Sequence, residues 1–117
     1  MVSLTTDPLD LTPIHRYLRS PLASCEVFVT LTVHGDAPWI FEARMEEALA
    51  AMHAIADAMR TEAVKVALVH RLGPVAPEEI YLIIGVSAKS HAAALAHCES
   101  ASERFNRDVP VWKRVEV

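Results

Sequence analysis

The sequence has few of the residues from which recognisable sites are most often built. It holds three glycines and two cysteines, and no apolar run approaches the ~18 residues that a membrane span needs. Three scattered glycines exclude a glycine-rich phosphate loop. Cys25 and Cys98 lie far apart with no C-x-x-C spacing. Two unpaired thiols are therefore a better interpretation than a disulfide.

Positive charge is also scarce. Eleven lysines and arginines stand against fifteen acidic residues, which gives a net charge of −4. Domains that bind nucleic acid concentrate positive charge, so this balance gives no reason to expect that function. The first seven residues lack the basic and then apolar order of a secretory signal. We therefore expect a cytoplasmic protein that binds neither nucleic acid nor a membrane.

The composition that is present is that of one ordinary globular domain. Apolar residues make up 52% of the chain and charged residues 22%, and the length suits a single core over residues 1–117. Six histidines are scattered without metal-ligand spacing, and no pair of carboxylates is spaced for acid–base chemistry. We expect no metal site and no resident cofactor.

Hydrophobic periodicity predicts eight elements in the order α-β-β-α-β-β-α-β. The predicted helices are a short one that Asp10 or Thr12 caps and Ser20-Pro21 ends, one from Met45 to about Arg60, and one over residues 87–105. Strands are predicted over residues 25–33, 39–42, 64–72, 80–86 and 109–115. The strand over 39–42 is expected to pair back on 25–33 as a hairpin, and Gly73-Pro74 is expected to separate the strand over 64–72 from the strand over 80–86.

The burial expected for these elements defines a fold class. Methionines, alanines and Ile55 recur at helical spacing from Met45 to Met59, and the last helix should bury Ala94, Leu95 and Cys98 with their neighbours. The strand over 80–86 is nearly all apolar and should be central, whereas a proline places the last strand at an edge. We predict an α+β fold, an α/β-hammerhead-like sandwich with helices on one face of a mixed or antiparallel sheet.

Two short stretches hold the candidate chemistry. Residues 70–74 read His-Arg-Leu-Gly-Pro and residues 109–114 read Val-Pro-Val-Trp-Lys-Arg. Neighbouring residues of a strand point to opposite faces, so one member of each cationic pair can turn into a pocket. A lysine beside a tryptophan could then act on an anion or a carbonyl. A solvated basic strand end is the competing interpretation.

These stretches also carry a resemblance to a family. Residues 66–73, then 83–88 (Ile-Ile-Gly-Val-Ser-Ala), then 109–114 are similar in content, order and spacing to the large subunit of molybdopterin synthase. The Asp-Pro-Leu-Asp of residues 7–10 and the strand at 27–30 also fit. The resemblance covers most of the chain, and the Pro-x-Trp-Lys ending combined with the upstream His-Arg-x-Gly is its most specific part.

The resemblance implies a function, partners and an assembly. Members of this family form dimers, and each large subunit binds a small ubiquitin-like sulfur carrier whose Gly-Gly tail ends in a thiocarboxylate. The tail enters a basic pocket, where sulfur passes to cyclic pyranopterin monophosphate. Cationic groups suit such a pocket because the tail and the substrate phosphate are both anionic.

Carried over residue by residue, the family pattern is incomplete in this chain. Lys113 matches the pocket lysine after the tryptophan, but the more critical lysine seven positions earlier is Asn106. The His and Arg of the Ser-Ala-His-Arg motif become Ser90 and His91, and the long loop after the first predicted strand is shortened to residues 34–38. The groups left to bind the anionic partners are Arg71, Lys89, His91, Arg107 and Arg114.

Two hypotheses follow from this partial match. The first is a molybdopterin synthase large subunit in which sulfur transfer is weak, altered or lost. The second is a non-catalytic paralogue that binds the carrier, or an intact large subunit, as a regulatory or scaffolding module. An unrelated α+β dimer with a convergent sequence is a third, weaker interpretation.

Overall fold

The computed structural model describes residues 1–60 and 65–115. Its elements in chain order are β1 (Val2–Thr5), α1 (Leu11–Leu18), β2 (Cys25–Thr32), β3 (Trp39–Ala43), α2 (Met45–Ala58), β4 (Lys65–Arg71), β5 (Gly73–Val75), β6 (Ile80–Ala88), α3 (His91–Asp108) and β7 (Val111–Val115). The first residue of the strand predicted over residues 64–72, Val64, lies outside the described residues. The predicted mixed α+β class is confirmed.

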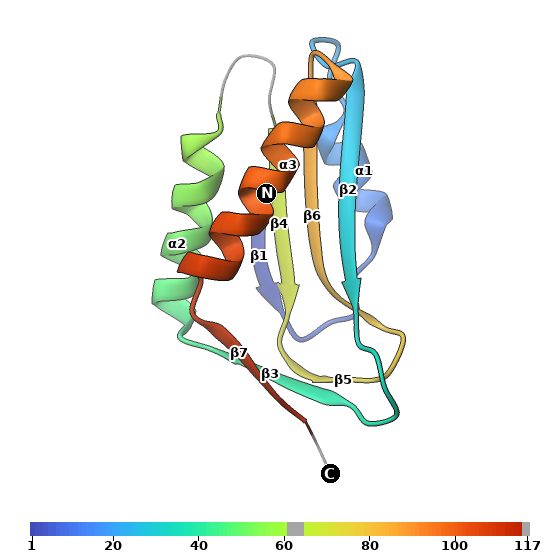
Figure 1. Ribbon diagram of the computed structural model, residues 1–117, viewed down its shortest axis with the longest axis vertical. Coiled ribbons are helices and arrows are strands. Elements are labelled where there is room, and N and C mark those ends of the chain that lie inside the picture. The colour runs from blue at the N-terminus through green and yellow to red at the C-terminus, as the bar shows by residue number, and fades with distance from the viewer. Residues whose placement is uncertain (61–64, 116–117) are drawn as a thin grey trace.

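The strands form two sheets. A four-stranded sheet has the order β1-β4-β6-β2, and a three-stranded sheet has the order β5-β3-β7. In the larger sheet β1 runs parallel to β4, while the other pairs are antiparallel. Figure 1 shows α2 and α3 in front of the larger sheet, α1 behind it, and the smaller sheet crossing below.

Both faces of the larger sheet are covered, whereas the sequence predicted helices on one face only. Alternate residues of β4 and β6 separate onto the two faces, as strand geometry requires. Leu68 and Ile84 pack under α2 and α3, while Ala67 and Ile83 pack against Ile14 of α1. The prediction that β6 is central and buried is confirmed.

The hairpin predicted between the strands over 25–33 and 39–42 is wrong. The edge strand β2 pairs with β6 over its whole length, and β3 lies in the other sheet between β5 and β7. The end of β2 is instead tied to the loop before β6, where the Val33 amide donates to the Glu79 carbonyl at 3.0 Å and the Glu78 amide donates to the Val33 carbonyl at 2.8 Å. These bonds hold the end of β2 against the loop before β6, and β3 does not fold back to pair with β2.

Two short strands were not predicted. Apolar and polar residues do not clearly alternate along β1. This strand forms because its backbone pairs in parallel with β4. The strand β5 begins at Gly73, where a break was predicted, because the positive φ of Gly73 (81°) turns the chain and Pro74 then sits on a strand at the edge of the smaller sheet.

Helix boundaries also shift from those predicted. Asp10 caps α1 by accepting from the Thr12 amide at 2.9 Å. The helix α3 starts at His91 rather than residue 87, because β6 continues to Ala88 and Ser90 provides the cap. Two residues expected in the core, Met45 and Leu95, are about half exposed at the helix surface.

Three further observations concern the cysteines, membrane-spanning helices and metal ligands. Cys25 and Cys98 are both free, as predicted. No helix among the described residues is long and apolar enough to cross a membrane. Within residues 1–60 and 65–115, no group of three or more histidine, cysteine or acidic side chains is placed to hold a metal ion.

Candidate functional site

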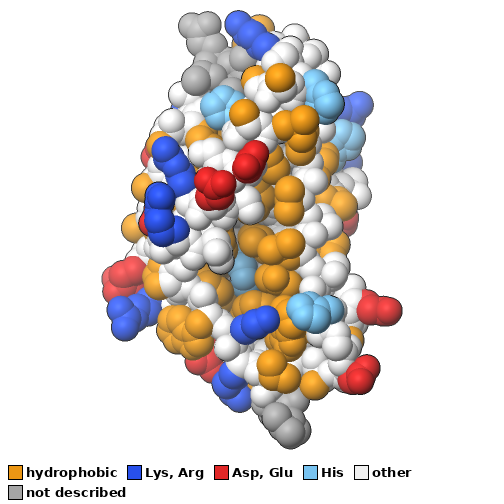
Figure 2. Space-filling model, in the orientation of Figure 1, with side chains coloured by type: hydrophobic (Ala, Val, Ile, Leu, Met, Phe, Trp, Pro, Cys, Tyr) orange, Lys and Arg blue, Asp and Glu red, His pale blue; other side chains and the backbone are white. Residues whose placement is uncertain are grey.

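A pocket of about 500 Å³ opens where the C-terminal end of α3 meets the smaller sheet. Five ring-bearing side chains supply much of its wall: Phe41, His70, Tyr81, Phe105 and Trp112. Its polar lining comes from Ser102, Glu103, Asn106 and Lys113. Figure 2 shows a hollow on this face, with hydrophobic side chains around it and a histidine surface recessed within it.

The junction of α3 and β7 brings the two matched family positions to this pocket. Val109 ends the helix with its amide donating to the Phe105 carbonyl at 3.1 Å, and the chain then turns directly into the strand. Asn106 therefore lies on the last turn of the helix and Lys113 on the strand, and both line the same pocket. The short connection at residues 109–110 brings these two positions, seven residues apart in the sequence, into one lining.

Lys113 rests on an aromatic ring. Its ammonium nitrogen Nζ lies 3.2 Å from the centroid of the Trp39 indole. Trp112 and Arg114, its neighbours in β7, donate instead to the two carboxylate oxygens of Glu42, each at 3.2 Å. Of the Lys-Arg pair, Lys113 lines the pocket and Arg114 does not.

His70 lines the pocket and is uncharged near neutral pH, whereas the sequence analysis counted it as one of a cationic pair with Arg71. The ring stacks parallel to Phe105 at 5.8 Å and meets the edge of Phe41 at 4.9 Å. Burial among these rings lowers the pKa of His70 to about 4, against a smaller opposing effect of its backbone hydrogen bond. In that bond Nδ1–H donates to the Arg71 carbonyl at 2.6 Å, since a carbonyl can only accept.

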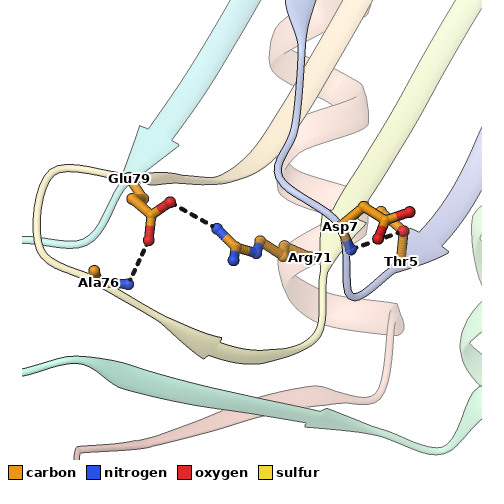
Figure 3. A network of polar contacts seen from close by, with 5 residues as sticks. All are labelled: Thr5, Asp7, Arg71, Ala76 and Glu79. Atoms are coloured by element: carbon orange, nitrogen blue, oxygen red, sulfur yellow. Dashed lines mark hydrogen bonds and ion pairs between the residues drawn. The ribbon is translucent and has the colours of Figure 1, made fainter.

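The Arg71 side chain does not line the pocket but forms an ion pair that holds a loop in place. Its Nη1 donates to Glu79 Oε2 at 3.0 Å, and the other oxygen of that carboxylate accepts from the Ala76 amide at 2.9 Å (Figure 3). These bonds lower the pKa of Glu79, the amide of Ala76 contributing most. The Arg71 side chain is 12% exposed and closes the loop between β5 and β6.

The other predicted binding residues lie outside the lining of this pocket. Lys89 and His91 sit at the N-terminal end of α3, about 22 Å along the helix from Asn106 at 1.5 Å per residue. Arg107 forms a bidentate pair with Asp108, at 2.9 and 3.1 Å, which raises its pKa. Arg114 is paired with Glu42. Within one copy of the chain, the pocket therefore brings together Lys113 and Asn106 but none of the other predicted binding residues.

The charge of the pocket differs from the basic pocket that the resemblance implied. The described lining contains one ammonium, Lys113, and one carboxylate, Glu103, while His70 is neutral. Sequence reasoning missed the aromatic wall and Trp39. Trp39 and Phe41 do alternate along β3, but only the register of β3 with β7 shows that they lie beneath Lys113.

A second groove of about 490 Å³ continues along α3 from the first. It is lined by Val27 and Val29 of the edge strand β2 and by Leu95, Cys98 and Glu99 of the helix. Ser102 and Glu103 belong to both cavities. Figure 2 shows hydrophobic side chains gathered in a band beside α3 along this face.

The fold and the position of the pocket define a class, and comparison with known proteins supplies its name. The profile of the MoaE protein family matches residues 4–107. The molybdopterin synthase catalytic subunit of Pyricularia oryzae is 38% identical over 98% of this chain and 68% of its own length. The corresponding protein of Drosophila mojavensis is 30% identical over 97% of this chain, which spans 33% of that protein.

Solved structures agree with this assignment. The molybdopterin biosynthesis MoaE protein from Burkholderia ambifaria superposes with a TM-score of 0.89 at 26% identity, covering 96% of this chain and 80% of that one. Molybdopterin synthase from Staphylococcus aureus gives a TM-score of 0.91 at 22% identity, covering 97% and 88%, and supports the fold alone. The chain belongs to the MoaE family, as the resemblance predicted.

Proposed function

We propose that this protein is the large subunit of a molybdopterin synthase in which sulfur transfer is slower than in complete members of the family. The observation that carries the proposal is the pocket at the α3–β7 junction, which holds Lys113 at the family's lysine position and Asn106 where the second lysine stands in the family pattern. The substrate is cyclic pyranopterin monophosphate, and the sulfur donor is the thiocarboxylated tail of a small ubiquitin-like carrier.

The pocket suits the end of a narrow, anionic peptide. Glycines at the end of a tail add no side chains, and walls such as Phe105 and Tyr81 exclude water around the charged end. Lys113 then supplies the positive charge that a thiocarboxylate requires. A structure whose name describes a complex of subunits 1 and 2 of the molybdopterin-converting factor from Helicobacter pylori shares this fold, with a TM-score of 0.87 at 16% identity over 97% of this chain and 83% of that one.

Reduced catalysis follows from the chemistry of Asn106. An asparagine side chain donates hydrogen bonds but is neutral, so it can neither neutralise an anion nor act as an amine nucleophile. The nearby Glu103 carboxylate opposes the charge of Lys113 rather than reinforcing it. Removing one preorganised donor typically slows a reaction by ~10²–10³-fold, and this protein should be slower than a complete enzyme by at least that factor.

A homodimer in the cytoplasm belongs to the same proposal. Apolar side chains such as Leu95 are exposed beside the unpaired edge of β2, and the groove there offers a surface for a second copy. Sedimentation at micromolar concentration should give a dimer, and a monomer would contradict this part of the proposal.

The alternative is a non-catalytic module that binds the carrier or an intact large subunit. The near-neutral lining of the pocket favours it, because such a lining can hold a tail without activating it. The two functions separate in one experiment, in which the purified protein is mixed with thiocarboxylated carrier and cyclic pyranopterin monophosphate. Slow dithiolene formation supports the enzyme, and carrier binding without product supports the module. Failure to bind the carrier contradicts the enzyme and leaves only a module that binds an intact large subunit.

A further inference from the structure

The contact between Lys113 and Trp39 joins the smaller sheet to the pocket. The ammonium lies 3.2 Å from the ring centroid, well within the ~6 Å over which a cation is attracted to an aromatic face. Among the described residues Lys113 has no ion pair and no hydrogen bond from its side chain. The indole is therefore the contact that defines where this ammonium sits.

Trp39 is well suited to act as a fixed platform. It is 6% exposed, and the rings of His34, Phe41 and Tyr81 meet it at centroid distances of 4.8, 6.2 and 5.7 Å. These contacts leave the indole little freedom to move. A lysine side chain, in contrast, has a flexible four-carbon stem and would sample many positions without a partner.

The chemical nature of the partner decides what Lys113 can still do. A carboxylate would also orient the ammonium, but it would cancel the charge that an incoming anion needs. An aromatic face attracts a cation through its quadrupole and carries no net charge. Lys113 is thus oriented while its full positive charge remains available at the pocket.

We propose that Trp39 is a positioning residue for Lys113, holding its ammonium where the anionic end of the carrier tail arrives. The inference rests on the proposed function and extends it to a residue outside the lining of the pocket. It matters in this chain because Asn106 leaves Lys113 as the one ammonium in the described lining. Preorganising that single charge raises affinity by removing the cost of ordering it at binding.

A double-mutant cycle on carrier affinity tests the role of Trp39. Binding of a carrier with an intact Gly-Gly end is measured by calorimetry for Trp39→Leu, Lys113→Ala and the double variant. We expect Lys113→Ala to lower affinity about tenfold, Trp39→Leu to lower it several-fold, and Trp39→Leu to have no further effect once Lys113 is alanine. Trp39→Phe, which keeps an aromatic face, should recover most of the loss.

The matched control is Val75→Ala. Val75 is fully buried and lies opposite Trp39 in the smaller sheet, but it does not line the pocket. It should destabilise the sheet and leave carrier affinity unchanged. If Trp39→Leu weakens binding equally in the Lys113→Ala background, Trp39 is only structural and the inference is overturned. A gain in affinity for Trp39→Leu would also overturn it, since the ring would then be withholding the ammonium.

A spectroscopic measurement on the unmodified protein separates this inference from the proposed function. Ring currents shift protons above an aromatic face upfield, so the ε-methylene NMR signal of Lys113 should lie upfield of that of Lys89. Trp39→Phe should reduce the difference. An unshifted Lys113 signal overturns the positioning role even if the carrier binds. A shifted signal without carrier binding supports the contact and contradicts the proposed function alone.

Discussion

The larger and the smaller sheet of this protein are built from different kinds of residue. The larger sheet is held by fully buried aliphatic side chains such as Leu68, Ile83 and Ile84 between helices on both faces. The smaller sheet has three strands, and the rings of Trp39 and Phe41 are the bulkiest side chains in its buried cluster. Stability is concentrated in the first region, and the groups able to meet an anion lie at the edge of the second.

This division explains how the fold can persist while the site changes. A lysine replaced by asparagine at Asn106 alters an exposed position on the last turn of α3, which the core does not depend on. The same helix turn supplies Phe105, which is buried in the main core and also forms a wall of the pocket. The scaffold therefore maintains the shape of the pocket independently of its charge.

The largest expected effect is a loss of stability in the larger sheet. Leu68→Ala removes a fully buried side chain at the centre of β4 and should lower the free energy of unfolding by about 2–5 kcal/mol. Leu22→Ala, at an exposed site between α1 and β2, should change it by no more than about 0.5 kcal/mol. Urea denaturation of both variants measures the difference. Similar losses for the two would contradict the division between core and surface.

The next effect is the dependence of stability on pH through His70. Its pKa is about 4 in the folded protein and 6.5 in the unfolded chain, so the folded state favours the neutral ring. The resulting stabilisation is complete above pH 6.5 and is lost as pH falls toward 4, by about 3 kcal/mol in total. His70→Phe should remove this part of the pH profile in urea titrations, whereas His53→Gln, at an exposed site, should not. Parallel profiles for wild type and His70→Phe would refute the assignment.

A smaller gain is expected from restoring charge to the pocket. Asn106→Lys should raise dithiolene formation about tenfold, or roughly 1.4 kcal/mol in activation free energy. The recovery should be partial because the Glu103 carboxylate remains in the same lining and opposes the added positive charge. Ser102→Lys, one turn earlier in the same lining, tests whether position matters as well as charge and should give less. A wild-type rate equal to that of a complete enzyme would remove the basis of this prediction.

The smallest effect concerns the outer face of the smaller sheet. Glu42→Gln weakens the bonds from Trp112 and Arg114, which are exposed, so the free energy of unfolding should fall by less than about 1 kcal/mol. Carrier affinity should fall much less than in Lys113→Ala, because Glu42→Gln leaves the Lys113 charge in place and only loosens Trp112 in the pocket wall. A loss of affinity comparable to that of Lys113→Ala would show that the two faces of the strand act together.

Most elements were predictable because their periodicity is local. The stripe that includes Met52 and Ile55 predicted α2, and the apolar run over residues 80–86 predicted the buried strand β6. The strand β1 was missed because its order depends on pairing with β4, some 65 residues away. The hairpin between β2 and β3 was wrongly predicted for a related reason, since neighbouring strands in sequence usually pair and here the loop before β6 intervenes.

The site was predictable in part. Lys113 and Asn106 were found through the family motif, and they do line one pocket. Arg71 was predicted to bind an anion because His70 and Arg71 close a strand just before a glycine turn. In the structure, Arg71 instead forms an ion pair with Glu79. Its neighbour His70 is the one that lines the pocket, and its charge depends on burial that no local pattern reveals.

The sequence by itself determined the class of protein, the main helices and strands, and the identity of the residues at the two family positions. These follow from spacings within single segments, where each residue's neighbours are known from the chain. The tertiary structure alone decided that Trp39 lies beneath Lys113, that His70 is neutral and that Lys89 and His91 are far from the pocket of their own chain. Each of these depends on the register and burial of segments distant in sequence, and the free energies that set them arise only when those segments meet.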